Sequence, residues 1–165
     1  MSLRRTISAL AIAATVATGL AVAPTAQAAT RDHPATIKVF LHSTEREVLD
    51  LGATGATLGD VVTGSGTVRA SKNGKLLGSF AYRAETVRVN MPGGIESRQS
   101  TQWITFADGS VMLSSLISVP QGTRPVESQE YVVVGGTGHY SGVAGTATFT
   151  PKSANNYVLT FHFVD

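Results

Sequence analysis

The chain has 165 residues, of which 42% are hydrophobic and 15% are charged, and it contains no cysteine. This length fits one domain, and the hydrophobic content is that of a globular protein rather than of a disordered tail. Without cysteine, disulfides, thiolate nucleophiles and cysteine-ligated zinc are excluded.

Residues 1–28 have the pattern of a secretory signal peptide. Arg4 and Arg5 give a positive start, residues 7–23 are small and apolar, and residues 26–28 (Ala-Gln-Ala) form a small-x-small cleavage site. The apolar stretch is rich in Ala and Thr, which is too weakly apolar for a membrane anchor. We therefore predict bacterial export, a secreted protein and no membrane anchor after cleavage. The paired arginines leave the Sec and Tat routes both open.

The leader also accounts for the positive charge of the chain. It carries two of the 13 basic residues and none of the 11 acidic residues, so the mature chain is formally neutral. A neutral domain without a basic run has no electrostatic footprint for phosphate backbones. We therefore expect no nucleic-acid partner.

Strand signals dominate after a loose terminus at residues 29–34. β-branched runs alternate with breaks at Gly, Asn, Asp and Pro. Asn73-Gly74 is typical of a tight hairpin, because both central residues of such a turn need φ > 0. The pattern predicts eight strands, at residues 35–42, 60–71, 76–89, 97–106, 110–119, 127–134, 142–150 and 156–164.

One short helix is predicted from Thr44 to Leu51, where acidic residues precede apolar ones. Consecutive strands joined mostly by short turns favour antiparallel neighbours. Two architectures fit this pattern, a closed up-and-down barrel and a two-sheet sandwich.

The glycine-rich segment at residues 135–138 (Gly-Gly-Thr-Gly) partly matches a dinucleotide-binding fingerprint. The third glycine of that fingerprint falls on Ser141, and residues 143–149 have a strand pattern, so no helix N-terminus follows to bind phosphate. We interpret the segment as a hairpin that uses positive φ. The four histidines are far apart and have no neighbours at metal-ligand spacing, so no metal site is predicted.

Several of these segments together resemble the allene oxide cyclase and dirigent barrels, most nearly the bacterial secreted proteins with an allene-oxide-cyclase-like barrel. Residues 131–140 are similar to a strand that ends in the family's G-G-S/T-G-x-F/Y turn, and residues 58–62 are similar to its second strand. The motif residues are Gly59, Asp60, Gly135, Gly136 and Gly138.

The resemblance implies an all-β fold, an eight-stranded antiparallel up-and-down barrel over residues 35–165. Members of the family are often homotrimers. It further implies that the barrel binds a hydrophobic small molecule and steers its cyclisation or coupling without a cofactor.

The residues of the plant cyclase are not matched. Its first-strand glutamate falls on Leu41, a second-strand asparagine on Gly66 and its cysteine on Ala84. A carboxylate that would stabilise a developing cation is therefore missing, and allene oxide cyclisation itself is not expected. The dirigent pattern matches at Glu130, which corresponds to the glutamate before the valines and the glycine turn.

The resemblance implies a lumen lined by alternate residues of the strands. The candidate catalytic groups are Glu130, as an acid/base whose pKa burial would raise, and Tyr82. The alternative for Glu130 is a carboxylate at the barrel mouth, paired with Arg83 or Arg98. The candidate ligand-lining residues are Val39, Leu41, Phe80, Thr86, Trp103 and Val132, with Trp103 a core aromatic if the lumen is filled.

Three functions remain open from the sequence. The first is a cofactor-free cyclase or isomerase that accelerates a reaction by holding its substrate near the attack geometry. The second is a carrier that binds a hydrophobic molecule without converting it. The third is a barrel filled by its own side chains that serves as a structural or surface protein.

Overall fold

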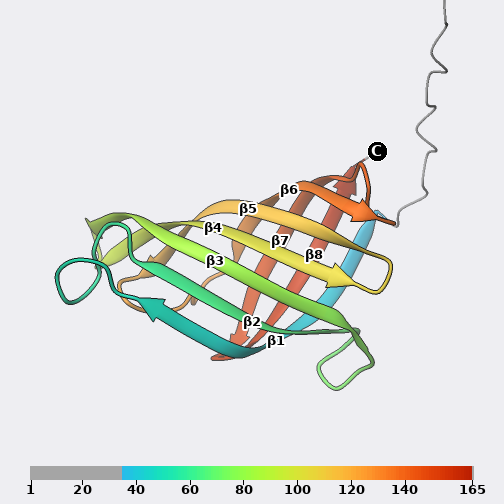
Figure 1. The fold of residues 1–165 in the computed structure, drawn as a ribbon, viewed down its shortest axis with the longest axis horizontal. Coiled ribbons are helices and arrows are strands. Elements are labelled where there is room, and N and C mark those ends of the chain that lie inside the picture. The colour runs from blue at the N-terminus through green and yellow to red at the C-terminus, as the bar shows by residue number, and fades with distance from the viewer. Residues whose placement is uncertain (1–34, 165) are drawn as a thin grey trace, which may run out of the picture. The chain divides into compact units, whose positions relative to one another are not determined.

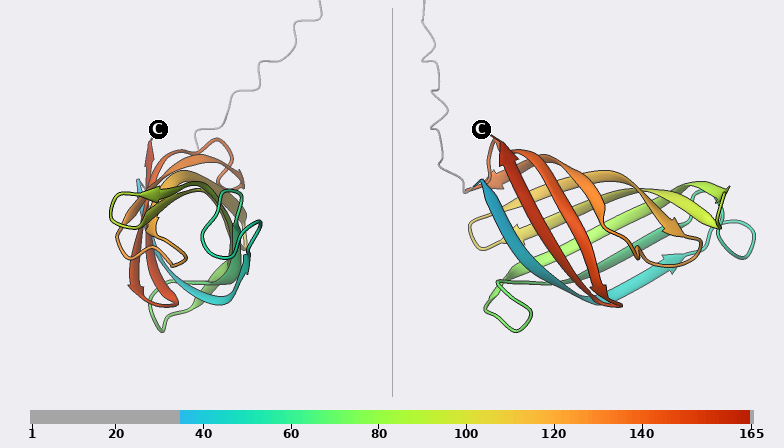
Figure 2. Two further views of the ribbon diagram at one scale, coloured as in Figure 1. Left: turned by 90° about the vertical axis from the view of Figure 1, so that its left-hand side faces the viewer. Right: turned by 180° about the vertical axis from the view of Figure 1, so that it is seen from behind.

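The computed structural model describes residues 35–164 and arranges them as a closed antiparallel barrel. Each strand pairs with the next in the chain, and β8 closes the ring by pairing with β1 (Figures 1 and 2). The barrel prediction is confirmed and the sandwich is excluded. The strands are β1 (Thr36–Leu49), β2 (Val61–Arg69), β3 (Leu76–Met91), β4 (Ile95–Phe106), β5 (Gly109–Pro120), β6 (Gln129–Gly138), β7 (Ala144–Ser153) and β8 (Asn156–Val164).

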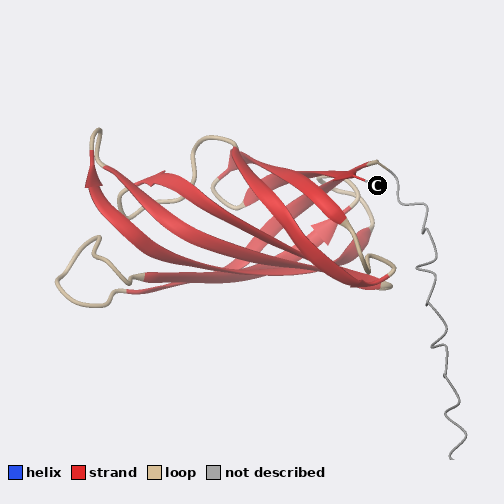
Figure 3. Ribbon diagram, turned by 90° about the horizontal axis from the view of Figure 1, so that it is seen from above, coloured by secondary structure: helices blue, strands red, loops and turns tan. Residues whose placement is uncertain are grey.

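Figure 3 shows only strands and loops in the described part of the chain. No helix there is long and apolar enough to cross a membrane. The predicted signal peptide and its cleavage site lie outside the described residues.

The helix predicted from Thr44 to Leu51 is wrong. β1 continues through this segment to Leu49 and pairs with β2 from Glu45↔Ser65 to Leu49↔Val61. Glu45 and Glu47, which indicated a helix start, lie instead on the exposed side of the strand. Pairing with a neighbouring strand overrides a weak local helix preference, because propensities amount to only tenths of a kcal/mol per residue.

The two ends of the barrel differ. At the end that carries the turns 70–75, 107–108 and 139–143, hereafter the filled end, inward side chains pack into a solid apolar core. At the opposite end, hereafter the open end, β1 to β4 extend towards the loops 50–60 and 92–94 (Figure 1). The core of the filled end includes Val39, Leu41, Val68, Ile104, Val111, Leu113, Leu159 and Phe161.

The glycine-rich segment is a strand end and turn, as interpreted from the sequence. Gly135 and Gly138 have φ of 155° and 60°, and β6 continues through Gly138, which pairs with Gly109. A Cβ at Gly136 would lie 2.4 Å from the carbonyl oxygen of Tyr140, so only glycine fits there. The motif therefore shapes the filled end of the barrel rather than a nucleotide site.

Asp60 organises the loop 50–60 at the open end. Its carboxylate accepts hydrogen bonds from the backbone N–H groups of Leu51 and Thr57, at 2.8 and 2.7 Å, and from the Thr57 hydroxyl at 2.8 Å. Gly59, with φ of 87°, supplies the bend that precedes it. The backbone donors on Thr57 and Leu51 hold the pKa of Asp60 below its ordinary value.

This lowered pKa predicts an acid-sensitive contribution to stability. The contribution is present above the unfolded pKa of about 3.9 and is lost as the pH falls through the folded value. We expect Asp60→Asn to be less stable than wild type at pH 7 and to show a smaller loss of stability between pH 7 and pH 3. Urea unfolding at the two pH values measures both quantities.

The control for this prediction is Glu127→Gln, which changes an exposed carboxylate in the loop 121–128. It should leave the stability at pH 7 unchanged. An Asp60→Asn protein with the same acid sensitivity as wild type would show that the Asp60 hydrogen bonds do not contribute.

Candidate ligand pocket

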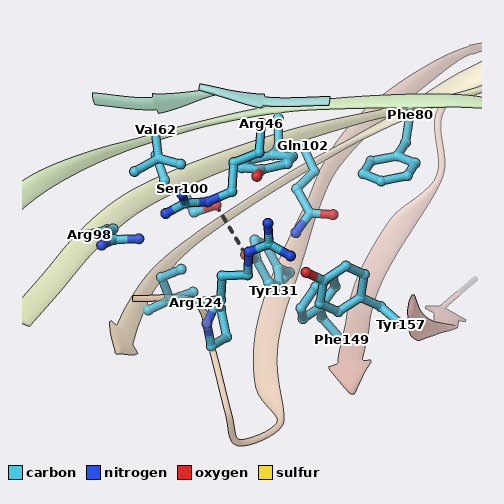
Figure 4. A pocket seen from close by; sticks show the side chains of 14 residues that line it. Arg46, Val62, Phe80, Arg98, Ser100, Gln102, Arg124, Tyr131, Phe149 and Tyr157 are labelled. Atoms are coloured by element: carbon cyan, nitrogen blue, oxygen red, sulfur yellow. Dashed lines mark hydrogen bonds between the residues drawn. The ribbon is translucent and has the colours of Figure 1, made fainter. Parts of the chain in front are cut away.

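A partly enclosed cavity lies inside the barrel between the apolar core and the open end, and we call it the inner pocket. Its free volume is about 40 Å³, which is room for about three water molecules. It is lined by Arg46, Val62, Phe80, Tyr82, Ala84, Arg98, Ser100, Gln102, Ile117, Arg124, Pro125, Tyr131, Phe149 and Tyr157 (Figure 4).

Aromatic rings form much of the wall of the inner pocket. Phe149 and Tyr157 stack with their ring centroids 4.6 Å apart, and Tyr131 meets Phe149 edge-on at 6.2 Å. Phe80 and Tyr82 are nearly parallel at 6.4 Å. These rings offer flat apolar surfaces and phenol groups side by side, which suits an apolar molecule with one or two polar atoms.

Two glycines of β2 make room for the rings of β3. Gly64 is opposite Tyr82 and Gly66 is opposite Phe80 in the β2–β3 register. A Cβ at Gly64 would lie 2.5 Å from the Tyr82 ring, and one at Gly66 would lie 2.6 Å from the Phe80 ring. The side chains of β3 therefore lie against bare backbone, and the glycines set how far these rings project into the lumen.

A β-bulge brings Arg46 into the lumen. Leu41 and Ser43 of β1 are buried, so strict alternation would place Glu45 inside. The register of β1 against β2 shifts between Ser43 and Glu45, and Arg46 pairs opposite the lumen-facing Gly64. The extra residue reverses the phase of the strand, as bulges do.

A row of polar side chains on β4 faces the lumen. Glu96, Arg98, Ser100 and Gln102 are each at most 5% exposed. Arg98 donates to the Glu96 carboxylate, and the Tyr131 hydroxyl donates to the Ser100 hydroxyl at 3.0 Å. Burial raises the pKa of the Tyr131 phenol, which therefore stays protonated at neutral pH.

The Glu96–Arg98 pair also anchors the loop 121–128. Glu96 accepts from the backbone N–H of Gly122 at 3.3 Å, and Arg98 donates to the carbonyl of Thr123 at 3.0 Å. The next residue, Arg124, donates to the Ala154 carbonyl and the Asn155 side chain in the turn between β7 and β8. This loop therefore closes part of the open end and carries Arg124 to the inner pocket (Figure 4).

A second cavity, the mouth pocket, lies next to the inner pocket at the open end. Its volume is about 160 Å³, and it shares Arg46, Val62 and Arg98 with the inner pocket. The loop residues Gly55 and Asp60 line its far side. The two cavities therefore form one path from the open end into the barrel, interrupted by the arginine side chains.

Three of the predicted site residues lie along this path. Phe80 and Tyr82 line the inner pocket, and Thr86 lines the mouth pocket. Burial raises the pKa of the Tyr82 phenol, so it is a neutral hydrogen-bond donor at physiological pH. Val39 and Leu41 face inward too, but they belong to the core and not to the wall of the inner pocket.

The predicted inward positions of Glu130, Val132 and Trp103 are wrong. Glu130 is exposed, and Val132 and Trp103 are 59% and 42% exposed on the outside of the barrel. The side chains of β6 that face inward are Tyr131 and Val133, one residue out of phase with the prediction.

The alternative pairing of Glu130 with Arg83 or Arg98 is also absent. Within residues 35–164, Arg83 pairs with Glu85 at 3.1 Å, and Arg98 pairs with Glu96. No group of three or more His, Asp or Glu side chains in this part of the chain is arranged to hold a metal ion.

Several lining residues were missed from the sequence, notably Arg46, Arg98, Arg124 and Gln102. Both faces of residues 95–106 contain polar side chains, so alternation alone did not indicate which of them enters the lumen. Arg124 lies in a loop, where no periodicity exists to predict its direction.

The fold is shared with solved structures of several enzymes. The chain superimposes on a pyocyanin demethylase with a TM-score of 0.66 and 19% identity, covering 78% of this chain and 99% of that one. The superposition on the Diels-Alderase AbmU from Streptomyces koyangensis has a TM-score of 0.61 and 16% identity, and it covers 78% of this chain and 64% of that one. The superposition on a pterocarpan synthase dirigent protein has a TM-score of 0.58 and 13% identity, and it covers 90% of this chain and 96% of that one.

No protein-family model and no curated protein sequence matches the chain. The structural matches show that the chain has the barrel fold of these proteins, a dirigent protein among them, which is the fold that the resemblance inferred from the sequence implied.

Proposed function

We propose that this protein binds a hydrophobic small molecule through its inner and mouth pockets and steers the cyclisation or isomerisation of that molecule without a cofactor. The observation that carries the proposal is the inner pocket, an aromatic-lined cavity in which a few polar groups converge. The solved structures of the same fold include a demethylase, a Diels-Alderase and a pterocarpan synthase.

The aromatic wall of the inner pocket suits catalysis by confinement of the substrate in a reactive orientation. The stacked rings of Phe149 and Tyr157 would hold an apolar substrate in one orientation, which reduces the entropic cost of reaching the transition state. The neutral phenol of Tyr82 would donate a hydrogen bond to a carbonyl or ether oxygen as negative charge develops there. Tyr82 is therefore the catalytic candidate that we propose to test, and Glu130 is not, because its side chain is exposed.

A ligand must displace side chains to enter. The free volume of about 40 Å³ is well below the roughly 300–1,000 Å³ of typical small-molecule sites. Arg46 and Arg124 stand between the inner pocket and the outside, and their long side chains have the rotamer freedom to move. We propose that rotation of these two side chains admits the ligand without opening of the barrel.

The second candidate function is a carrier that does not transform its ligand. It is favoured by the hydrogen bonds of Glu96, a buried carboxylate in the wall of the mouth pocket. This carboxylate already accepts from Arg98 and from the backbone N–H of Gly122. No Asp or Glu among the described residues lines the inner pocket itself, so a strong general base is missing there.

The test starts from the full-length chain expressed in a bacterial host. We propose export with cleavage after Ala28, so the protein collected from the medium should begin at Ala29. We also propose a homotrimer, supported by exposed apolar side chains on neighbouring outer positions of β4 to β6. These side chains are Trp103, Met112, Leu116, Val132 and Val134.

Mass spectrometry then identifies molecules that copurify with this protein, and each is incubated with wild type and with Tyr82→Phe. We expect a bound apolar molecule whose conversion is slowed about 10²-fold or more by the substitution. Tyr157→Phe is the control, because the Tyr157 hydroxyl already donates to the Ala154 carbonyl at 3.0 Å. A molecule that binds but stays unchanged would favour the carrier, and a barrel that never binds one would favour the filled structural protein.

A further inference from the structure

Three arginine side chains converge on the inner pocket from different elements. Arg46 comes from β1, Arg98 from β4 and Arg124 from the loop 121–128 (Figure 4). All other residues that line this pocket have side chains that are neutral at pH 7. The pocket is thus strongly cationic, although the mature domain as a whole is formally neutral.

Only one of these guanidinium groups is neutralised by a carboxylate. Within residues 35–164, Glu96 forms an ion pair with Arg98, and neither Arg46 nor Arg124 forms an ion pair. Arg124 donates to two neutral oxygens, on Ala154 and Asn155. Among the described residues, the Arg46 side chain has no hydrogen-bond partner.

Such an arrangement is costly unless an anion offsets it. Burial, together with the neighbouring charges of Arg124 and Arg98, lowers the pKa of Arg46. Like charges held close together in a partly enclosed cavity destabilise the folded state, and an opposite charge placed among them relieves that repulsion. The wall of the inner pocket is therefore expected to bind a negatively charged ligand more tightly than a neutral one.

Unused hydrogen-bonding atoms lie in the same wall. The Nε atom of Arg98 and the Oε1 atom of Gln102 are buried and have no partner among the described residues, and these two residues are only 5% and 4% exposed. Buried polar atoms are normally satisfied, so each such atom marks a position where a ligand group or a water belongs. Arg98 Nε is a donor, as an anionic oxygen requires, whereas Gln102 Oε1 is an acceptor and gives no support to an anion.

We propose that the inner pocket binds hydrophobic carboxylic acids, with the carboxylate held by Arg46 and Arg124 and the apolar body held against the aromatic wall. This inference rests on the proposed ligand-binding function and narrows its substrate class. A guanidinium binds a carboxylate through two parallel hydrogen bonds, which gives orientation as well as affinity. The bound carboxylate would fix which carbon atoms of the substrate face Tyr82.

Two matched probes test the proposal, 1-naphthoate and its neutral isostere 1-naphthamide. Isothermal titration calorimetry of protein purified from the full-length chain should give at least a tenfold lower Kd for the acid. Arg46→Gln and Arg124→Gln should each weaken the acid about tenfold or more, the usual loss for a charge-assisted hydrogen bond. Both should change the Kd of the amide by less than about twofold.

The control variant is Arg88→Gln, which removes an exposed cation of β3 away from both pockets. It should leave both probes unaffected, and Arg46→Lys should retain part of the preference for the acid. Amide chemical shifts of wild type, titrated with naphthoate, should change at Gln102 and Phe149, which locates the probe without any variant.

The outcomes separate this inference from the function on which it rests. Equal affinity for acid and amide, with shift changes at the inner pocket, would overturn the carboxylate preference and leave the hydrophobic site standing. Equal weakening of the acid by Arg88→Gln would also overturn it, because a general field effect would then explain the binding. Absence of binding by both probes at millimolar concentration would count against the proposed function itself.

Discussion

Replacing Glu96 by Gln is expected to destabilise the protein by about 3–5 kcal/mol, because it leaves the Arg98 guanidinium buried without its counter-charge. Glu96 is 1% exposed and Arg98 is 5% exposed, so water cannot take over the lost interaction. The substitution also removes the charge that attracts the Gly122 N–H. Urea unfolding measures the change in the free energy of unfolding.

The matched control for Glu96→Gln is Glu85→Gln in the neighbouring strand. Glu85 pairs with Arg83 at 3.1 Å, but both side chains are about half exposed, at 43% and 56%. Solvent screens such a pair, so its loss should cost about 1 kcal/mol or less. Equal losses for the two variants would show that the buried pair is not the anchor of this end of the barrel.

The consequence for the pocket can be tested with a double substitution. Glu96→Leu combined with Arg98→Met removes both charges and fills a similar volume, so it should recover most of the stability lost in Glu96→Gln. It should not restore the loop 121–128, whose contacts with Gly122 and Thr123 depend on the pair. Naphthoate binding through Arg124 should therefore remain weakened in the stable double variant.

Gly64→Ala is expected to destabilise the protein by about 1–3 kcal/mol, the usual cost of overpacking, and to lower the affinity for pocket ligands. The new Cβ would lie 2.5 Å from the Tyr82 ring and 2.7 Å from the Glu45 carbonyl oxygen. Because the backbone oxygen is fixed in the β1–β2 ladder, the ring must move away from β2 and into the inner pocket. Calorimetry of ligand binding, together with unfolding, measures both effects.

Ser79→Thr serves as the control for Gly64→Ala, because it adds one methyl group to an exposed position of β3. Its stability should stay within about 0.5 kcal/mol of wild type. Unchanged ligand affinity in a destabilised Gly64→Ala protein would show that Tyr82 does not border the bound molecule.

The barrel was predictable because its determinants are local and repeated. The alternating strands and the glycine motif at residues 135–138 each indicate the same architecture. Asn73-Gly74 does lie in a connection between two paired strands, but the expected tight turn is wrong, because neither residue has positive φ and the connection spans residues 70–75. The lining of the two pockets was predicted only in part. Phe80, Tyr82 and Thr86 follow the plain alternation of β3 and were placed correctly along the pockets.

The missed residues depend on features that alternation does not encode. Arg46 enters the lumen through a bulge, and Arg124 enters from a loop anchored by a buried ion pair. The phase of β6 was misjudged because Tyr131 and Val132 are both apolar, so residues 131–134 read equally well in either orientation. This error of one residue in the phase of β6 led to the wrong prediction that Glu130 and Val132 point inward.

The bulge in β1 determines whether a cationic or an anionic side chain of this strand faces the lumen. Glu45 and Glu47 flank Arg46 and lie on the outer surface only because the strand contains one residue more than its partner between Ser43 and Glu45. Thr44 is the extra residue, because Ser43 pairs with Gly66 and Glu45 pairs with the adjacent Ser65, so deletion of Thr44 would remove the bulge and still leave Arg46 opposite Gly64. With Thr44 present, the bulge, and not side-chain identity alone, therefore determines that a cation rather than two carboxylates faces the lumen at this point of the cylinder.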